Sequence, residues 1–195
     1  MRKGYSKRIN NPAFKRYQKN ANKYTMIFSL VLCSIVVVGF FIYGEISVEM
    51  DNPQALYIGI AIGAMFISIA LIQIIQRLKD KTWDGVVIDK KVEDKQRKKY
   101  MKGTRLFKRK YWEEFTLYTV HIKGEDGHEH NIFVEDDNTL YDYYKIGDKV
   151  RHHKGLNTFE KYDKTGDKII FCNACASMND IKDDTCHRCG APLLK

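Results

Sequence analysis

The residues of this chain best suited to chemistry are four cysteines near the C-terminus, Cys172, Cys175, Cys186 and Cys189. They form two C-x-x-C pairs separated by a ten-residue spacer. Each pair can fold into a tight turn that directs two thiolates toward one point, and two such turns supply four sulfur ligands for a tetrahedral Zn²⁺. Because four thiolates complete the coordination, such a metal stabilises the fold and leaves no open position for water or substrate.

Two disulfides, or a redox-active C-x-x-C pair, are the alternative interpretations of these cysteines. We favour one structural zinc ion, whose binding would supply much of the folding free energy of a module of roughly 25 residues. His187 lies between two of the cysteines and is interpreted as a neighbour of the site, because four thiolates already complete it.

The segments Phe171–Cys175 and Cys186–Pro192 resemble the short zinc ribbons that end many bacterial membrane and regulatory proteins. The resemblance covers about residues 170–195 and implies a zinc ribbon there. Gly190 fits such ribbons, since knuckle turns often need a positive φ, whereas Ala176 occupies the position where the first knuckle usually carries glycine.

The elements that must position this module begin with two long uncharged runs, Tyr24–Gly44 and Asn52–Gln76. About 20 helical residues cross the hydrocarbon core of a bilayer, so the runs predict transmembrane helices at about 24–44 and 55–75. A polar leader of about 23 residues and the lack of a small-x-small pattern argue against a cleaved signal peptide. We expect residues 24–76 to form a membrane hairpin with a short external loop.

Basic residues flank both ends of this predicted hairpin. Residues 1–23 form a basic arm without an acidic residue, and the loop between the runs carries three acidic residues and no basic one. The positive-inside rule then places both termini in the cytoplasm of a multi-pass protein of the cell membrane. Zinc agrees with this compartment, where thiols stay reduced. Abundant Lys, Ile and Asn with only three Pro suit a bacterium of low GC content.

Small residues recur every four positions in the second run, at Ala55, Gly59 and Gly63. Such a stripe lets two helix backbones approach closely, so we expect it to pack against the first helix or against a second copy of the chain. Neither run contains a charged residue, which argues against an ion or proton pathway.

Short strands separated by turns are predicted for residues 81–168. Candidate strands are 82–92, 114–122, 129–135, 146–150 and 158–162, with a polar, helical stretch at 137–144. This number of strands suits a small antiparallel all-β domain, either barrel-like or strongly twisted. The expected fold class is therefore a membrane α-helical hairpin, this cytoplasmic β domain and a zinc ribbon.

One insertion of the β domain, residues 95–110, is strongly basic and contains no acidic residue. Without it, acidic residues outnumber basic ones after the second run. Three interpretations stay open: a solvated β-hairpin, contact with anionic lipid headgroups, and, as the least favoured, nucleic-acid binding. The candidate anion-binding residues are Lys95, Arg97, Lys98, Lys99, Lys102, Arg105, Lys108, Arg109 and Lys110.

No catalytic motif for hydrolases, kinases or metalloproteases occurs in the sequence. We therefore expect a non-enzymatic, membrane-anchored binding or scaffold protein that presents its β domain and ribbon to a protein partner. A membrane-tethered nucleic-acid binder that uses residues 95–110 is the alternative. An accessory subunit of a membrane enzyme or transporter is a third, and a homo-oligomer fits any of them.

Overall fold

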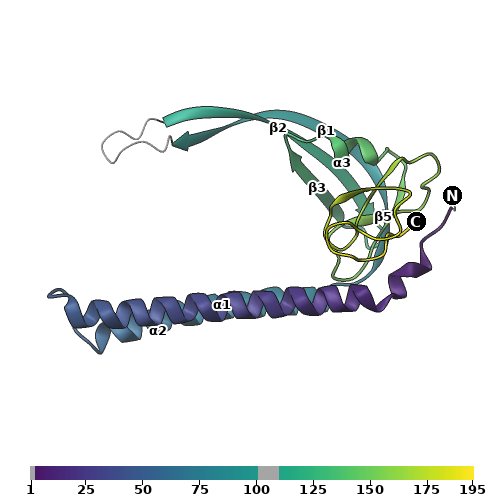
Figure 1. Ribbon diagram of the computed structural model, residues 1–195. Helices are drawn as coiled ribbons and strands as arrows, with labels where there is room; N and C mark the ends of the chain where they lie inside the picture. The colour runs from purple at the N-terminus through teal and green to yellow at the C-terminus, as the bar shows by residue number, and fades with distance from the viewer. Residues whose placement is uncertain (1–2, 101–109) are drawn as a thin grey trace. The chain divides into compact units, whose positions relative to one another are not determined.

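The computed structural model describes residues 3–100 and 110–195. Its elements form two compact units, one comprising residues 10–81 and 154–156, and the other comprising the remaining described residues (Figure 1). The helices of the first unit are α1 (Pro12–Ile46) and α2 (Gln54–Lys79). The short helix η1 begins at Lys7 in the second unit and ends at Asn10, the first residue of the other unit. The second unit also contains β1 (Trp83–Tyr100), β2 (Lys110–Gly124), β3 (Glu129–Glu135), α3 (Thr139–Tyr143), β4 (Lys149–His152), β5 (Phe159–Lys161), β6 (Ile169–Phe171) and β7 (Met178–Asp180).

Both predicted apolar helices are present, and each is long and apolar enough to cross a membrane. The first helix begins at Pro12, well ahead of the apolar run, because Asn11 caps it by accepting a hydrogen bond from the Ala13 amide at 2.9 Å. Proline at the first helical position is favourable, since its fixed φ suits the helix and its missing N–H has no partner there. The polar part of the basic arm therefore extends α1 by three turns.

The main sheet has five antiparallel strands in the order β3-β2-β1-β4-β5. This confirms the predicted antiparallel domain. The sheet does not close into the expected barrel-like form, because β1 and β2 are far longer than their neighbours and the edge strands β3 and β5 do not pair. Residues 94–100 of β1 pair with residues 110–116 of β2, where no other strand joins them, and we call this two-stranded part the β1–β2 ribbon (Figure 1).

The core of the second unit lies where α3 and the C-terminal segment cover one face of the sheet. Its buried members come from the sheet, from α3 and from the C-terminal segment: Val87, Val120, Ile122, Tyr143, Tyr144, Val150 and Phe171. Phe171 belongs to β6, and its ring meets Tyr143 edge to face at 5.1 Å between centroids. The cysteine module and the sheet therefore share one core.

Residues 3–9 belong to the same unit as the sheet, although α1 and α2 separate them from it in sequence. The Gly4 amide donates to the Tyr162 carbonyl at 2.8 Å, and Lys3 forms a β-bridge and an ion pair with Asp163. Arg8 pairs with Asp184 at 3.1 Å, between the two cysteine pairs. This N-terminal segment therefore contacts both the end of the sheet and the cysteine module.

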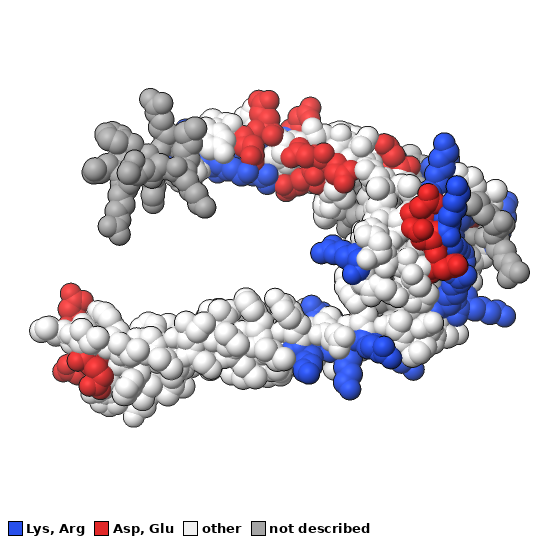
Figure 2. Space-filling model, viewed as in Figure 1, with Lys and Arg blue, Asp and Glu red and all other residues white. Residues whose placement is uncertain are grey.

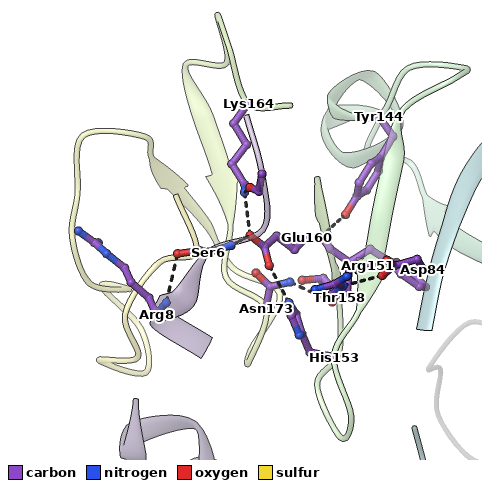
Figure 3. Close-up of polar contacts among 12 residues, drawn as sticks. Ser6, Arg8, Asp84, Tyr144, Arg151, His153, Thr158, Glu160, Lys164 and Asn173 are labelled. Atoms are coloured by element: carbon purple, nitrogen blue, oxygen red, sulfur yellow. Dashed lines mark hydrogen bonds and ion pairs between the residues drawn. The ribbon is translucent and has the colours of Figure 1, made fainter. Parts of the chain in front are cut away.

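A buried carboxylate, Glu160, holds this contact together, and Figure 3 shows its partners. One oxygen accepts from the Ser6 amide at 2.6 Å and from Lys164 Nζ at 2.8 Å, and the other lies 2.6 Å from His153 Nε2. Glu160 is only 2% exposed, and His153 and Lys164 are also buried. We call Ser6, His153, Glu160 and Lys164 the Glu160 cluster.

Loss of the Glu160 carboxylate should destabilise the second unit strongly. Removing one member of a buried ion pair typically costs about 3–5 kcal/mol, because its partner is left charged and unpaired. We expect a loss of this size for Glu160→Ala, and a smaller loss for Glu160→Gln, whose amide oxygen can still accept from Ser6. Urea unfolding of the chain carrying Trp112→Phe, whose tryptophan fluorescence comes from Trp83 beside the core, measures it.

Asp163→Asn provides the matched control, because it weakens the exposed Lys3 pair at the same contact. Exposed pairs stabilise proteins little, so the unfolding midpoint should stay the same. Equal losses for Glu160→Ala and Asp163→Asn would contradict a special role for the buried carboxylate.

Candidate metal centre

The two C-x-x-C segments fold into matching turns. In the first, the Ala176 amide donates to the Cys172 carbonyl at 2.8 Å and the Cys172 amide donates to the Ser177 carbonyl at 2.9 Å. In the second, Gly190 donates to Cys186 at 2.9 Å and Cys186 donates to Ala191 at 2.8 Å. The offsets along the chain are identical, so both turns direct their cysteines in the same way.

The four thiols meet at one point, within 4.8 Å of one another, and form a candidate metal site. Two Sγ–Sγ distances are 3.6 Å, Cys172 to Cys189 and Cys175 to Cys186. A tetrahedral zinc site with Zn–S bonds of about 2.3 Å needs sulfurs about 3.8 Å apart, so the cluster fits such an ion. All four thiols are free, whereas a disulfide would hold two sulfurs at about 2.05 Å.

Hydrogen-bond donors surround the sulfurs and make them unequal. Ser177 Oγ lies 3.0 Å from both Cys175 Sγ and Cys186 Sγ, a contact that the spacing of the cysteines did not indicate. Burial opposes ionisation of Cys186, but the Ser177 hydroxyl and two backbone amides lower its pKa to about 6. Burial raises the pKa of the Cys172 thiol. Donors of this kind stabilise thiolates and orient them toward a metal.

His187 lies outside the sulfur cluster. Its amide and its Nδ1 both contact Asn179 Oδ1, at 3.0 and 2.8 Å, and its side chain is exposed. Within the described residues, the four cysteines are the one group of potential metal ligands of three or more. This position agrees with the interpretation of His187 as a neighbour of the site.

Hydrogen bonds fasten the first turn to the β5 side of the sheet. Asn157 donates to the Ala174 carbonyl at 2.7 Å, Thr158 donates to the Cys172 carbonyl at 3.2 Å, and Asn173 donates to the Thr158 carbonyl at 3.1 Å. Asn173 and Thr158 are buried. The cysteine module is therefore held by polar contacts as well as by the shared core.

The described part of the basic insertion lies on the β1–β2 ribbon, where the register gives it acidic partners. Arg97 contacts Glu113 at 2.6 Å and Glu135 at 2.7 Å, Lys99 contacts Glu113 at 2.5 Å, and Lys95 contacts Glu93 at 3.3 Å. Basic and acidic side chains consequently lie side by side along the ribbon (Figure 2). Four predicted anion-binding residues fall outside the described residues, namely Lys102, Arg105, Lys108 and Arg109.

The small residues of α2 face α1. Ala55 is fully buried, and Gly59 and Gly63 are buried as well. A Cβ at Gly59 would lie 2.8 Å from Phe40 Cβ, and one at Gly63 would lie 2.7 Å from Cys33 Sγ. Both distances are shorter than packed carbon or sulfur atoms allow, so the glycines permit the close approach of the two helices.

The comparisons with known proteins give no relative from which a function could be transferred: no family model, no curated protein and no solved structure matches the chain. Interpretation of this site therefore depends on its geometry and chemistry.

The backbone of the first turn is strained at Ala176. Ala176 has a φ of +60°, and the equivalent residue in the second turn, Gly190, has a φ of +70°. The left-handed conformation costs an L-residue roughly 1–2 kcal/mol, and the greater chain entropy of unfolded glycine offsets part of the gain. Ala176→Gly should therefore stabilise the protein by about 0.5–1 kcal/mol, measured from the urea midpoint of metal-loaded protein.

Gly190→Ala is the reciprocal variant, since a Cβ there meets no other atom within 4 Å and its effect is on the backbone alone. It should destabilise the protein by about 1 kcal/mol. A lower midpoint for Ala176→Gly would show that the Ala176 methyl group contributes more than its strained φ costs.

Proposed function

We propose that this chain is a non-enzymatic, membrane-anchored binding protein whose β domain and zinc ribbon recognise a protein partner. The observation that carries this proposal is the convergence of four thiols into a closed cluster that is packed on the sheet. A four-thiolate site leaves a metal no position for substrate, so its contribution is a rigid surface.

The membrane anchor is supported by the exposure of α1 and α2. Many large apolar side chains on both helices are exposed within the described fold, including Phe28, Ile35, Met65 and Ile72. Apolar surface of this extent is unfavourable in water and favourable in lipid. Along their middle parts the helices carry no charged side chains (Figure 2).

A shared side for both flanks of the hairpin is supported by the N-terminal segment. Residues 3–9 precede α1 and the sheet follows α2, yet the Ser6 amide and Glu160 are hydrogen-bonded. Two spanning helices return the chain to the side from which it came, as this contact requires. Together with the basic flanks and the free thiols, the contact favours the cytoplasmic side for both termini.

Zinc is the favoured metal for the cluster. Four thiolates at tetrahedral spacing select soft or borderline metals, and the structural sites of this type in proteins hold mainly zinc. Cys172, Cys175, Cys186 and Cys189 would hold the ion, which would supply cohesion between the two turns.

Nucleic-acid binding is disfavoured because basic side chains of the β1–β2 ribbon form ion pairs with acidic ones. Affinity for phosphates depends on the number of cations available to replace counterions. Glu113 forms ion pairs with both Arg97 and Lys99, so the described part of the β1–β2 ribbon has fewer cations available for phosphates than the sequence suggests.

Metal content is the first test of the proposed zinc ribbon. The full chain purified under reducing conditions should contain one zinc per chain by elemental analysis, because its four thiols complete one site. Cys172→Ser combined with Cys186→Ser should abolish this zinc. Cys33→Ser removes the thiol outside the cluster and should leave the zinc content unchanged. Wild-type protein that contains no metal after this purification would contradict the zinc site.

Recognition of a protein partner by the proposed zinc ribbon can be tested by affinity capture after cross-linking in cells. We expect wild type and Cys33→Ser to retain the same partner, and the double serine variant to lose it. A further variant, His187→Ala with Arg188→Ala, alters exposed side chains of the second turn while keeping every thiol. Loss of the partner from this variant at full zinc content would locate recognition on that turn. Identical partners for all four proteins would contradict a role for the zinc ribbon in binding.

A further inference from the structure

The two faces of the β1–β2 ribbon differ in chemistry. Paired residues of antiparallel strands lie on the same face, and alternate residues of each strand share it. One face therefore carries the pairs Lys98 with Trp112 and Tyr100 with Lys110. The row between these two pairs places Lys99 and Tyr111 on the opposite face.

The first of these faces combines free cations with exposed aromatic rings. Trp112 and Tyr100 are 59% and 58% exposed. Lys98 Nζ lies 4.8 Å from the Trp112 ring centre, and Lys110 Nζ lies 5.8 Å from that of Tyr100. Neither lysine has an acidic partner among the described residues. We call these four residues the aromatic–basic face.

The opposite face is electrically paired. Glu113 accepts from both Arg97 and Lys99, and the guanidinium of Arg97 also covers the Phe115 ring at 4.7 Å. Lys95 pairs with Glu93.

The aromatic–basic face also carries acidic residues farther from the end of the ribbon: Glu114 accepts from Gln96 at 2.9 Å, and Asp94 accepts from Thr116 at 2.9 Å. The lysines without a described acidic partner therefore lie in the last two rows of this face, beside Trp112 and Tyr100.

We propose that the aromatic–basic face is a contact surface for the anionic headgroup layer of a membrane. Tryptophan and tyrosine favour the interface between water and hydrocarbon, because their rings are apolar and their N–H and O–H groups can remain hydrated. Lysines beside them add attraction to anionic lipids that falls off within a Debye length.

This inference rests on the proposed membrane anchor, which makes a weak contact sufficient. Lys98 lies nineteen positions after Lys79, the end of α2, a span of at most about 65 Å when fully extended. A tethered surface meets its ligand at a high effective concentration, so two lysines and two rings suffice where a free protein would need more. Two cations are few for a nucleic-acid site, which depends on many phosphate contacts.

Fluorescence of the full chain in lipid nanodiscs tests the proposal. The chain has two tryptophans, and Trp83 packs against the core, so subtraction of the Trp112→Phe spectrum isolates the emission of Trp112. In nanodiscs with phosphatidylglycerol, we expect this emission to shift to shorter wavelength and to be quenched by lipids brominated near the headgroup. In phosphatidylcholine alone, or at 1 M salt, where the Debye length is about 3 Å, both effects should be largely lost.

Matched charge variants assign the effect to one face. Lys98→Gln with Lys110→Gln should abolish the shift in phosphatidylglycerol, whereas Lys95→Gln with Lys99→Gln, which removes the same charge from the opposite face, should retain it. Equal loss from both pairs would overturn the assignment to one face and leave only general charge attraction.

Other outcomes separate this proposal from the anchor itself. If the chain inserts into nanodiscs but phosphatidylglycerol does not change the emission of Trp112, the lipid contact is overturned and the membrane anchor is still supported. A chain that does not enter nanodiscs refutes the anchor on which the inference rests. A shift of Trp112 caused by single-stranded RNA in phosphatidylcholine nanodiscs, without any response to phosphatidylglycerol, would replace lipid by nucleic acid.

Discussion

A carboxylate that is removed from water must be paired, and the pairing of Glu160 explains how distant parts of this chain come together. Its two oxygens are shared among the Ser6 amide, Lys164 and His153. These partners come from the N-terminal segment, from the turn after β5 and from the end of β4. Because an unpaired buried charge is costly, none of the three segments can separate without a penalty. The contact joins residues more than 150 positions apart.

That contact also bears on the arrangement of the helices. The N-terminal segment leads into α1, and the sheet begins directly after α2. A chain whose two flanks are hydrogen-bonded to one another suits a hairpin of two spanning helices, which has both ends on one side of a membrane. Gly59 and Gly63 suit the same arrangement, since they let α2 lie close to α1.

The cysteine module is part of the β domain rather than an appendage. Phe171 enters the core beside Tyr143, and Asn157, Thr158 and Asn173 connect the first turn to the β5 side of the sheet. A metal that holds the two cysteine turns would therefore stabilise a surface that extends over the module and the adjoining sheet. Such coupling supports the proposed use of the module as a rigid recognition surface. A metal with this structural role needs no open coordination position for water or substrate.

The sequence by itself determined the features that depend on local spacing. Two C-x-x-C pairs with a ten-residue spacer predict a cluster of four thiols, and two long uncharged runs predict two helices of membrane-spanning length. The strand at Glu129–Glu135 was predicted with its observed bounds, because the turn with Gly124 and Gly127 precedes it and returns the chain as a hairpin partner. Each of these signals is contained within a few dozen consecutive residues.

Only the tertiary structure decided which charges are paired. The basic insertion contains no acidic residue, yet the register of β1 and β2 brings Glu113 between Arg97 and Lys99 and leaves Lys98 and Lys110 beside exposed rings. The open sheet and the docking of residues 3–9 on Glu160 likewise depend on strand lengths and long-range contacts. Pairing between distant residues is set by register and packing, and neither composition nor local periodicity specifies these.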